Sequence, residues 1–207
     1  MIKNLLFDLG GVIMDIRREN AVKALNDLGM RDANALLGDY VQSGVFRQLE
    51  EGNISPDAFL REVRNYFPDN GRDISGQAIY DAFMEFLIGI PVDRLRCLEA
   101  LHKNYRIYML SNTNIIMWEG RILDDFTADG HDIDYYFDGI VTSFEAHCYK
   151  PEKAIFDYAV EHLGIVPGET LFLDDSLKNV EAAQALGFNI LHVPTDTDFT
   201  ELLKCRL

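Results

Sequence analysis

Residues 2–15 read IKNLLFDLGGVIMD, and this stretch decides the fold class. The run from Ile2 to Phe7 contains four large apolar residues and ends at Asp8, shortly before the pair Gly10-Gly11. A short apolar run closed by a polar residue and glycines is typical of a buried strand that ends in a tight turn. Glycines also allow the backbone to approach a ligand closely. We therefore predict a buried strand with Asp8 at its carboxyl end.

Four further apolar runs of the same kind follow along the chain. They are Tyr105–Leu110, Gly139–Thr142, Leu171–Leu173 and Asn189–Val193. Apolar residues at helical spacing lie between most of these runs, and the clearest set is Ile155, Phe156, Ala159, Val160 and Leu163. Alternating strands and helices predict an α/β protein, with a Rossmann-like parallel sheet that carries helices on both faces.

One long stretch interrupts this alternation. From Ile16 to Gly89 the apolar spacing is helical throughout, and Ser55-Pro56 forms a good helix start, with a capping hydroxyl before a proline. The simplest interpretation is an all-helical domain inserted after the first strand. We therefore expect a catalytic core made of residues 1–15 and 90–207, and an inserted helical domain made of residues 16–89.

The charge and the apolar content of the chain restrict the kinds of molecule that it can bind. The chain has 207 residues, with 19 basic and 34 acidic side chains and a formal net charge of -15. A field of this sign repels nucleic acid and anionic membranes, and it would repel a phosphorylated substrate unless a cation were present. No apolar stretch approaches the ~18 residues of a membrane helix. We expect a cytoplasmic protein without nucleic-acid or membrane partners, and the sequence leaves its oligomeric state open.

Three scattered cysteines, Cys97, Cys148 and Cys205, give no disulfide framework and no zinc-ligand spacing. This sparse use of cysteine is typical of a reducing compartment.

Polar residues follow the predicted strands at their carboxyl ends, where open parallel sheets bind ligands. Asp8, Ser111-Asn112 and Asp174-Asp175 occupy three such ends. Lys150 follows another strand after a short loop and precedes Pro151. We expect these residues to converge, because the ends of parallel strands lie along one edge of the sheet.

Each of these residues also has an ordinary structural explanation. Asp8 suits a turn, Ser111-Asn112 and Asp174-Asp175 suit helix caps, and Lys150 suits a solvated loop. Together they indicate chemistry. A carboxylate can act as a nucleophile, and a hydroxyl with backbone N–H groups can bind an anion. Three converging carboxylates require a cation, and an all-oxygen ligand set suits Mg²⁺.

Four segments of the sequence together resemble the haloacid dehalogenase superfamily. They are FDLGGVIMD (7–15), LSNT (110–113), YKPEKAIF (149–156) and FLDDSLKNVEAA (172–183). The helical insert after the first segment is similar to the α-helical cap of the phosphatase branch that carries its cap there. The resemblance implies a Mg²⁺-dependent phosphomonoester hydrolase that acts through an aspartyl-phosphate, on a small phosphorylated metabolite such as a sugar phosphate.

The resemblance also implies roles for particular residues. Asp8 is expected to be the nucleophile and a metal ligand, together with Asp174, Asp175 and the Gly10 carbonyl. Ser111 and Asn112 are expected to bind the phosphoryl group, and Lys150 to neutralise the nucleophile and the phosphate. Asn179 occupies a position that steadies the metal site in this family.

One position departs from the pattern of the family's phosphatases. They usually carry an aspartate two residues after the nucleophile, which protonates the leaving group, whereas this chain has Gly10. Such general acid–base help is worth ~10²–10⁴-fold in rate. The start FDLGGV resembles a bacterial subgroup that includes sugar-1-phosphate phosphatases, whose anomeric phosphate leaves easily.

Two alternatives to a phosphatase stay open on the sequence. The first is a phosphate-ligand-binding module that lost turnover with the change to Gly10. The second is a 2-haloacid dehalogenase, which needs no metal and lacks the paired acid found here at Asp174-Asp175. A calcium loop over residues 125–136 is rejected, because Tyr136 stands where such a loop has glutamate.

Several weaker candidates for a site lie elsewhere in the chain. Arg17, Arg18 and Arg47 could bring positive charge from the insert, and Tyr40 or Gln42 could contact a substrate. Among the histidines, His147 is closest in sequence to Lys150.

Overall fold

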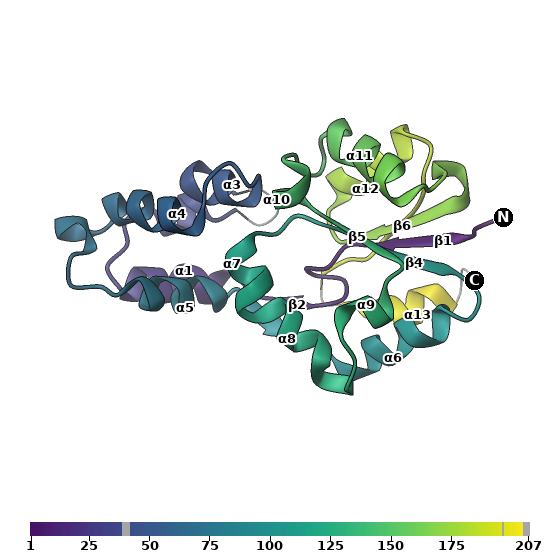
Figure 1. Ribbon diagram of the computed structural model, residues 1–207, viewed down its shortest axis with the longest axis horizontal. Coiled ribbons are helices and arrows are strands. Elements are labelled where there is room, and N and C mark those ends of the chain that lie inside the picture. Colours follow the sequence, from purple (N-terminus) through teal and green to yellow (C-terminus); the bar gives the residue numbers. More distant parts are fainter. Residues whose placement is uncertain (39–41, 196, 205–207) are drawn as a thin grey trace.

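The computed structural model describes residues 1–38, 42–195 and 197–204. Tyr40 and Cys205 lie outside these ranges. Among the described residues, five parallel strands form one sheet in the order β5-β4-β1-β6-β7 (Figure 1). The strands are β1 Asn4–Phe7, β4 Arg106–Ser111, β5 Gly139–Thr142, β6 Thr170–Asp174 and β7 Asn189–His192. The five predicted runs therefore all become strands of the predicted parallel sheet.

The central strand β1 is buried on both faces, and its side chains alternate between two apolar cores. Leu6 is in register with Tyr108 and Phe172, and these three side chains belong to the same core. Leu5 and Phe7 belong to the other core. Burial on both faces explains why this strand is a continuous apolar run in the sequence.

Helices cover both faces of the sheet, as predicted (Figure 1). One face carries α11 Lys153–Leu163 and α12 Leu177–Ala185. The other carries α6 Val92–Leu101, α9 Ile133–Tyr136 and α13 Phe199–Lys204. On this second face the ring of Phe7 meets the ring of Phe199 at 5.2 Å between centroids.

Short helical segments complete this part of the molecule. They are α7 Ile115–Met117, a π-helix Trp118–Ile122, α8 Leu123–Phe126, α10 Ser143–Ala146, and 3-10 turns at Thr127–Asp129 and Pro167–Glu169. Within the described ranges, no helix is both long enough and apolar enough to cross a membrane.

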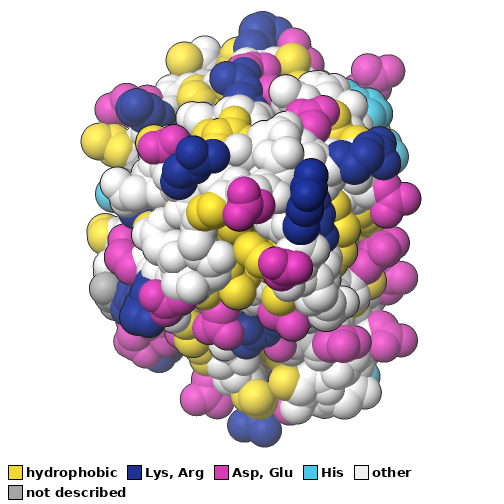
Figure 2. All heavy atoms as spheres, turned by 90° about the vertical axis from the view of Figure 1, so that its left-hand side faces the viewer, with side chains coloured by type: hydrophobic (Ala, Val, Ile, Leu, Met, Phe, Trp, Pro, Cys, Tyr) yellow, Lys and Arg dark blue, Asp and Glu magenta, His cyan; other side chains and the backbone are white. Residues whose placement is uncertain are grey.

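A separate group of helices extends beyond the carboxyl end of the sheet (Figure 1), and we call it the helical group. It consists of α1 Arg18–Asp27, α2 Ala33–Leu36, α3 Gly44–Glu50, α4 Pro56–Val63 and α5 Gly76–Met84, with 3-10 turns at Arg64–Tyr66 and Pro68–Gly71. Its centre is aromatic, with the Phe46 ring 5.2 Å from Phe59 and 4.9 Å from Phe83. Its outer end carries interspersed acidic and basic side chains (Figure 2).

The predicted helix start at Ser55-Pro56 is confirmed. Ser55 Oγ accepts a hydrogen bond of 3.2 Å from the Ala58 N–H, and Pro56 is the first residue of α4. A side-chain oxygen before the helix satisfies one of the N–H groups that the first turn leaves without a partner.

The expectation of helices alone from Ile16 to Gly89 is wrong at both ends of that stretch. Two short strands, β2 Asp15–Ile16 and β3 Leu87–Gly89, pair antiparallel where the chain enters and leaves the helical group. Two connections that run side by side in opposite directions can satisfy each other's backbone groups, and this explains the pairing.

Two arginines from the sheet-bearing part hold these connections. Arg94 donates to the Ile13 carbonyl at 3.1 Å and pairs with Asp15 at 2.7 Å. Arg121 donates to the carbonyls of Leu87 and Ile88, at 2.6 Å each. The entry and the exit of the helical group are therefore both tied to the rest of the fold.

Candidate active site

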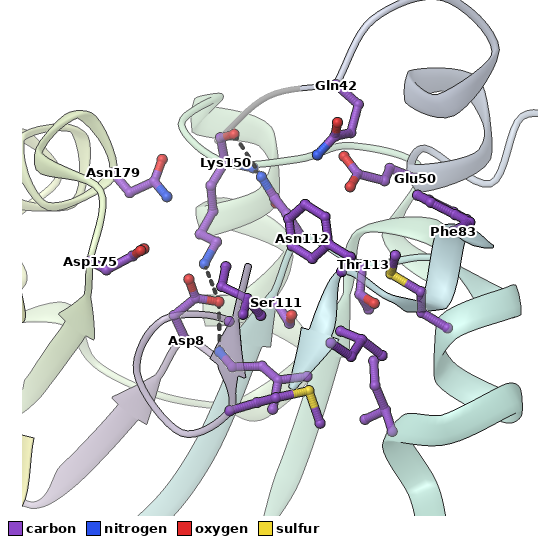
Figure 3. Close-up of a pocket in the computed structure, with 18 residues that line it drawn as sticks. Asp8, Gln42, Glu50, Phe83, Ser111, Asn112, Thr113, Lys150, Asp175 and Asn179 are labelled. Carbon is purple, nitrogen blue, oxygen red and sulfur yellow. Dashed lines mark hydrogen bonds and ion pairs between the residues drawn. The ribbon is translucent and has the colours of Figure 1, made fainter. Parts of the chain in front are cut away.

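The carboxyl ends of β1, β4 and β6 and the helical group enclose a cavity of about 730 Å³, counting its open mouth (Figure 3). Six predicted site residues line it, namely Asp8, Gly10, Ser111, Asn112, Lys150 and Asp175. Asn179 lines it too. Asp174 is fully buried and contacts Lys150. The predicted convergence of these residues is therefore observed.

Asp8 follows β1, and its position is set by the sheet. Its N–H donates to the Leu173 carbonyl at 2.8 Å, which continues the pairing of β1 with β6. Its Oδ1 accepts from the Leu9 N–H at 2.7 Å and pairs with Lys150 Nζ at 2.8 Å. Burial raises the pKa of Asp8 well above its usual range, and Asp174 adds to this effect while Lys150 opposes it.

Lys150 is buried between two carboxylates. Its Nζ lies 2.8 Å from Asp8 Oδ1 and 2.7 Å from Asp174 Oδ2. Burial alone would lower the pKa of Lys150, but attraction to Asp174 and Asp8 outweighs burial, and the pKa is raised. The lysine therefore stays charged inside the fold.

The side chain of Asn112 forms hydrogen bonds with both backbone groups of Lys150. Its side-chain Oδ1 accepts from the Lys150 N–H at 2.8 Å, and its Nδ2 donates to the Lys150 carbonyl at 3.0 Å. Lys150 lies before the helix and not in its first turn, because α11 begins only at Lys153. The amide of Asn112, and not the following helix, fixes the lysine.

Asp174 and Asp175 end β6, and their carboxylates have different surroundings. Asp174 Oδ2 contacts Lys150, while its Oδ1 accepts from the Ser176 N–H at 2.8 Å and from Asn179 Nδ2 at 2.9 Å. Asp175 lines the cavity. Burial, with repulsion from Asp174 next, raises the pKa of Asp175 to about 6.

The acidic cluster suits a hard divalent cation. Asp8, Asp174 and Asp175 are all buried, and each offers an oxygen within 4.8 Å of the others. Among the described residues that line the cavity, Lys150 is the single lysine or arginine. Three carboxylates against one ammonium leave negative charge, and an oxygen-rich set of this kind fits Mg²⁺.

Gly11 is required for this arrangement. Its φ of +75° lies in the left-handed region, and an added Cβ would come within 2.3 Å of Asp175 Oδ2. Gly10 is different, because a Cβ there would meet Ile16 Cδ1 at 3.4 Å, which is ordinary contact. The two glycines therefore differ in how they tolerate a side chain.

The loop after β4 forms another wall of the cavity. Ser111 is the last residue of β4, and Thr113 follows it on a loop that Ser143 holds. The Ser143 hydroxyl accepts from the Thr113 N–H at 3.0 Å and donates to the Thr113 carbonyl at 2.9 Å. Sequence reasoning missed Ser143, although its place directly after the strand Gly139–Thr142 offered a signal.

The far wall of the cavity comes from the helical group and the segment after β4. Phe83, Phe86, Leu87, Met117 and Ile122 make it largely apolar. Gln42 and Glu50 add polar groups there (Figure 3). Gln42 is one of the candidate substrate contacts predicted from the sequence, whereas nothing in the local pattern around Glu50 distinguishes it from a surface glutamate.

The basic residues considered from the insert have other contacts. Arg47 pairs with Glu51 at 2.8 Å and lies 4.5 Å from the centre of the Tyr149 ring. Arg17 and Arg18 border a neighbouring hollow beside Asp175. His147 Nδ1 lies 3.0 Å from the Glu51 carbonyl, so it joins the helical group to the loop before Lys150.

A family model and a similar characterised protein indicate the same family for this chain. A model of haloacid dehalogenase-like hydrolases matches residues 2–187. A D-ribitol-5-phosphate phosphatase from Bacteroides thetaiotaomicron is 34% identical over 100% of this chain and 99% of its own length. The expectations of a hydrolase and of this family are thereby confirmed.

Solved structures give the same result. A HAD family enzyme from Bacteroides thetaiotaomicron, in complex with magnesium and inorganic phosphate, matches with a TM-score of 0.89 at 34% identity, over 98% of this chain and 99% of that one. A predicted HAD-like family hydrolase from Porphyromonas gingivalis matches with a TM-score of 0.90 at 31% identity, over 100% and 98%. This chain belongs to the haloacid dehalogenase-like hydrolase family.

Proposed function

We propose that this chain is a Mg²⁺-dependent phosphomonoester hydrolase in which Asp8 is the nucleophile. The observation that carries the proposal is the buried contact between Lys150 Nζ and Asp8 Oδ1, at 2.8 Å, beside a cavity that also contains Ser111 and Asp175. The carboxylates of Asp8 and Asp175, one ammonium group and one hydroxyl therefore border the same space. Phosphoryl transfer depends mostly on such positioning and charge neutralisation.

We assign the attack on phosphorus to Oδ2 of Asp8, because the Leu9 amide and Lys150 both bind Oδ1. A bond forms from Oδ2 to phosphorus while the ester bond to the alcohol oxygen breaks, and the alcohol takes up a proton. Water then attacks the phosphorus of the aspartyl-phosphate, which releases inorganic phosphate and restores Asp8.

Gly10 has no side chain that could exchange these protons. In this proposal solvent supplies the proton of the leaving group, and esters with good leaving groups react fastest.

The other polar groups receive supporting roles. The Ser111 hydroxyl and the backbone N–H of Asn112 would hold the phosphoryl oxygens, since the Asn112 side chain is occupied by the backbone of Lys150. Lys150 would neutralise charge on Asp8 and on the phosphate.

Asp8, the Gly10 carbonyl, Asp174 and Asp175 would hold Mg²⁺. When bound, Mg²⁺ would offset the charge of the carboxylates and of the phosphate. Asn179 would steady this set through its 2.9 Å hydrogen bond to Asp174.

We further propose that residues 16–89 act as a cap over a core made of residues 1–15 and 90–207. The two paired strands β2 and β3 support this division, because the chain passes between the two parts only there. A cap that contributes one wall of the cavity can shield the reacting groups from water.

The substrate class we propose is a small sugar or polyol phosphate. The similar phosphatase from Bacteroides thetaiotaomicron is named for D-ribitol 5-phosphate, which supports this class. A cavity with a charged end at Asp8 and a mixed wall at Glu50 and Phe83 suits a short hydroxylated chain that carries one phosphate.

The test is phosphate release from a panel of sugar phosphates, polyol phosphates and an activated aryl phosphate, in Mg²⁺ and in EDTA. Release that needs Mg²⁺ is expected. Ligand binding without release would favour the binding module instead, and halide release from a 2-haloacid in EDTA would favour a dehalogenase.

A further inference from the structure

Glu50 is a cavity residue that the proposed chemistry leaves without a role. It is the last residue of α3, in the helical group, and it lines the same cavity as Asp8 and Lys150. In Figure 3 its carboxyl group and the Gln42 amide point toward each other, and Phe83 lies beside them. Glu50 therefore has Gln42 as its polar neighbour in the cavity, and both groups face the space that a substrate would occupy.

The turn after α3 fixes the position of Glu50. The Glu51 carbonyl lies 3.0 Å from His147 Nδ1, on the loop that leads to Lys150. Gly52, with φ +64°, packs so closely that an added Cβ would lie 2.0 Å from the Phe144 carbonyl oxygen. The backbone that follows Glu50 is thus fixed against the segment that leads to Lys150.

The surroundings of Glu50 favour a neutral carboxyl group. Burial raises its pKa to about 8, although a hydrogen bond with Gln42 lowers it and Glu51 raises it slightly. Of the described residues lining the cavity, Lys150 is the one lysine or arginine, and it is paired with Asp8 and Asp174. A protonated carboxyl group can donate one hydrogen bond and accept others.

Gln42 is itself held in place and completes a polar pair. It is buried, and its Oε1 accepts from the Gly38 N–H at 3.1 Å. The remaining wall, which includes Phe83, Met117 and Ile122, is apolar. A ligand against this wall would meet the hydrogen-bonding groups of Gln42 and Glu50, with apolar contacts beside them.

We propose that Glu50, together with Gln42, binds a hydroxyl group on the carbon chain of the substrate and thereby determines the specificity for hydroxylated phosphate esters. This inference rests on the proposed function. The apolar wall would contact the carbon atoms, and the phosphate would lie at Asp8. A site built to hydrogen-bond a hydroxyl group discriminates strongly against ligands that lack it, because its own polar groups are then left unpaired.

The test compares the kcat/KM of D-ribitol 5-phosphate with that of phenyl phosphate, whose organic part has no hydroxyl group. We expect Glu50→Leu to lower the ratio of the two values by about tenfold or more, since a buried polar interaction of this kind is lost. Glu50→Gln keeps the shape and part of the hydrogen bonding, and it should retain most of the ratio. Glu62→Gln is the matched control, because it makes the same substitution at an exposed position of the helical group.

The outcomes separate this inference from the proposed function. If the wild type releases phosphate from neither ester, the proposed function fails, whatever the role of Glu50. If the wild type is active but the ratio is unchanged in both Glu50 variants, the inference is overturned. A wild-type preference for an ammonium-bearing ester such as phosphoethanolamine would also overturn it. If Glu50→Leu does not fold, Gln42→Leu decides, because a lower ratio in that variant supports the inference and an unchanged ratio overturns it.

Discussion

The Nζ atom of Lys150 lies 2.8 Å from Oδ1 of Asp8, and both side chains are buried. These residues are far apart in the sequence, and each would be costly to bury alone. An isolated buried charge shifts its pKa or requires a partner. Each residue supplies the charge that the other needs. The same pair therefore stabilises the fold and takes part in the chemistry that we propose.

Asp8→Asn is expected to abolish turnover and leave the fold intact. The amide keeps the shape of the carboxylate but cannot form the bond to phosphorus. Phosphate release should fall by at least ~10³-fold, while the circular dichroism spectrum and the thermal midpoint stay close to wild type. Turnover near the wild-type rate in this variant would rule out Asp8 as the nucleophile.

Lys150→Met is expected to destabilise the protein when no metal is added. It leaves Asp8 and Asp174 buried without their ammonium partner, and breaking a buried pair in this way costs about 3–5 kcal/mol. Urea unfolding in EDTA measures the loss. Lys153→Met, which removes an exposed pair with Asp157, is the control and should change stability by less than ~1 kcal/mol.

Gly10→Asp is expected to preserve or raise the turnover of alkyl phosphates, whose alkoxide is a poor leaving group. The position has room for a Cβ, and a carboxyl group there could supply the missing proton transfer. The measurement is kcat on an alkyl and on an aryl ester. A fall on every substrate would mean that Gly10 is needed for space.

Gly11→Ala is the comparison for that variant. Its Cβ would meet Asp175 Oδ2 at 2.3 Å, on a backbone with φ +75°. We expect it to lose activity on both esters, because the Asp175 carboxylate would have to move.

Glu50 should make stability depend on pH. Its pKa is about 8 in the folded protein and 4.5 in its ordinary state, so the folded protein holds the proton more tightly. This contribution to the free energy of unfolding is complete below about pH 4.5 and is lost as the pH rises through about 8.

Comparison with Glu50→Gln isolates this contribution, because other carboxylates titrate in both proteins. The wild type should lose roughly 2 kcal/mol relative to the variant between pH 5 and pH 8, less than the full pKa shift would give, since Glu50 is partly exposed. Denaturant unfolding at a series of pH values measures the difference. Parallel curves for the two proteins would contradict the raised pKa.

Much of the sheet could be predicted because its strands are buried on both faces. Leu5, Leu6 and Phe7 are apolar without alternation, and the run stops where the chain leaves the core at Asp8. Contacts between segments distant in the sequence could not be predicted. The pairing of β2 with β3, which contradicts the expectation of helices alone, is one case, and the unforeseen contact of the Asn112 side chain with the backbone of Lys150 is another.

The α/β class, the helical insert and the order of the site residues along the chain all follow from local sequence; these residues are Asp8, Ser111, Lys150 and Asp174-Asp175. Apolar periodicity and residue chemistry are local properties, and they can be read without coordinates. The tertiary structure alone decided that Glu50 belongs to the same cavity. Its position arises from contacts of the turn after α3 with His147 and Phe144, and its raised pKa arises from burial. Burial and proximity between distant segments exist only in the folded chain, and local sequence does not encode them.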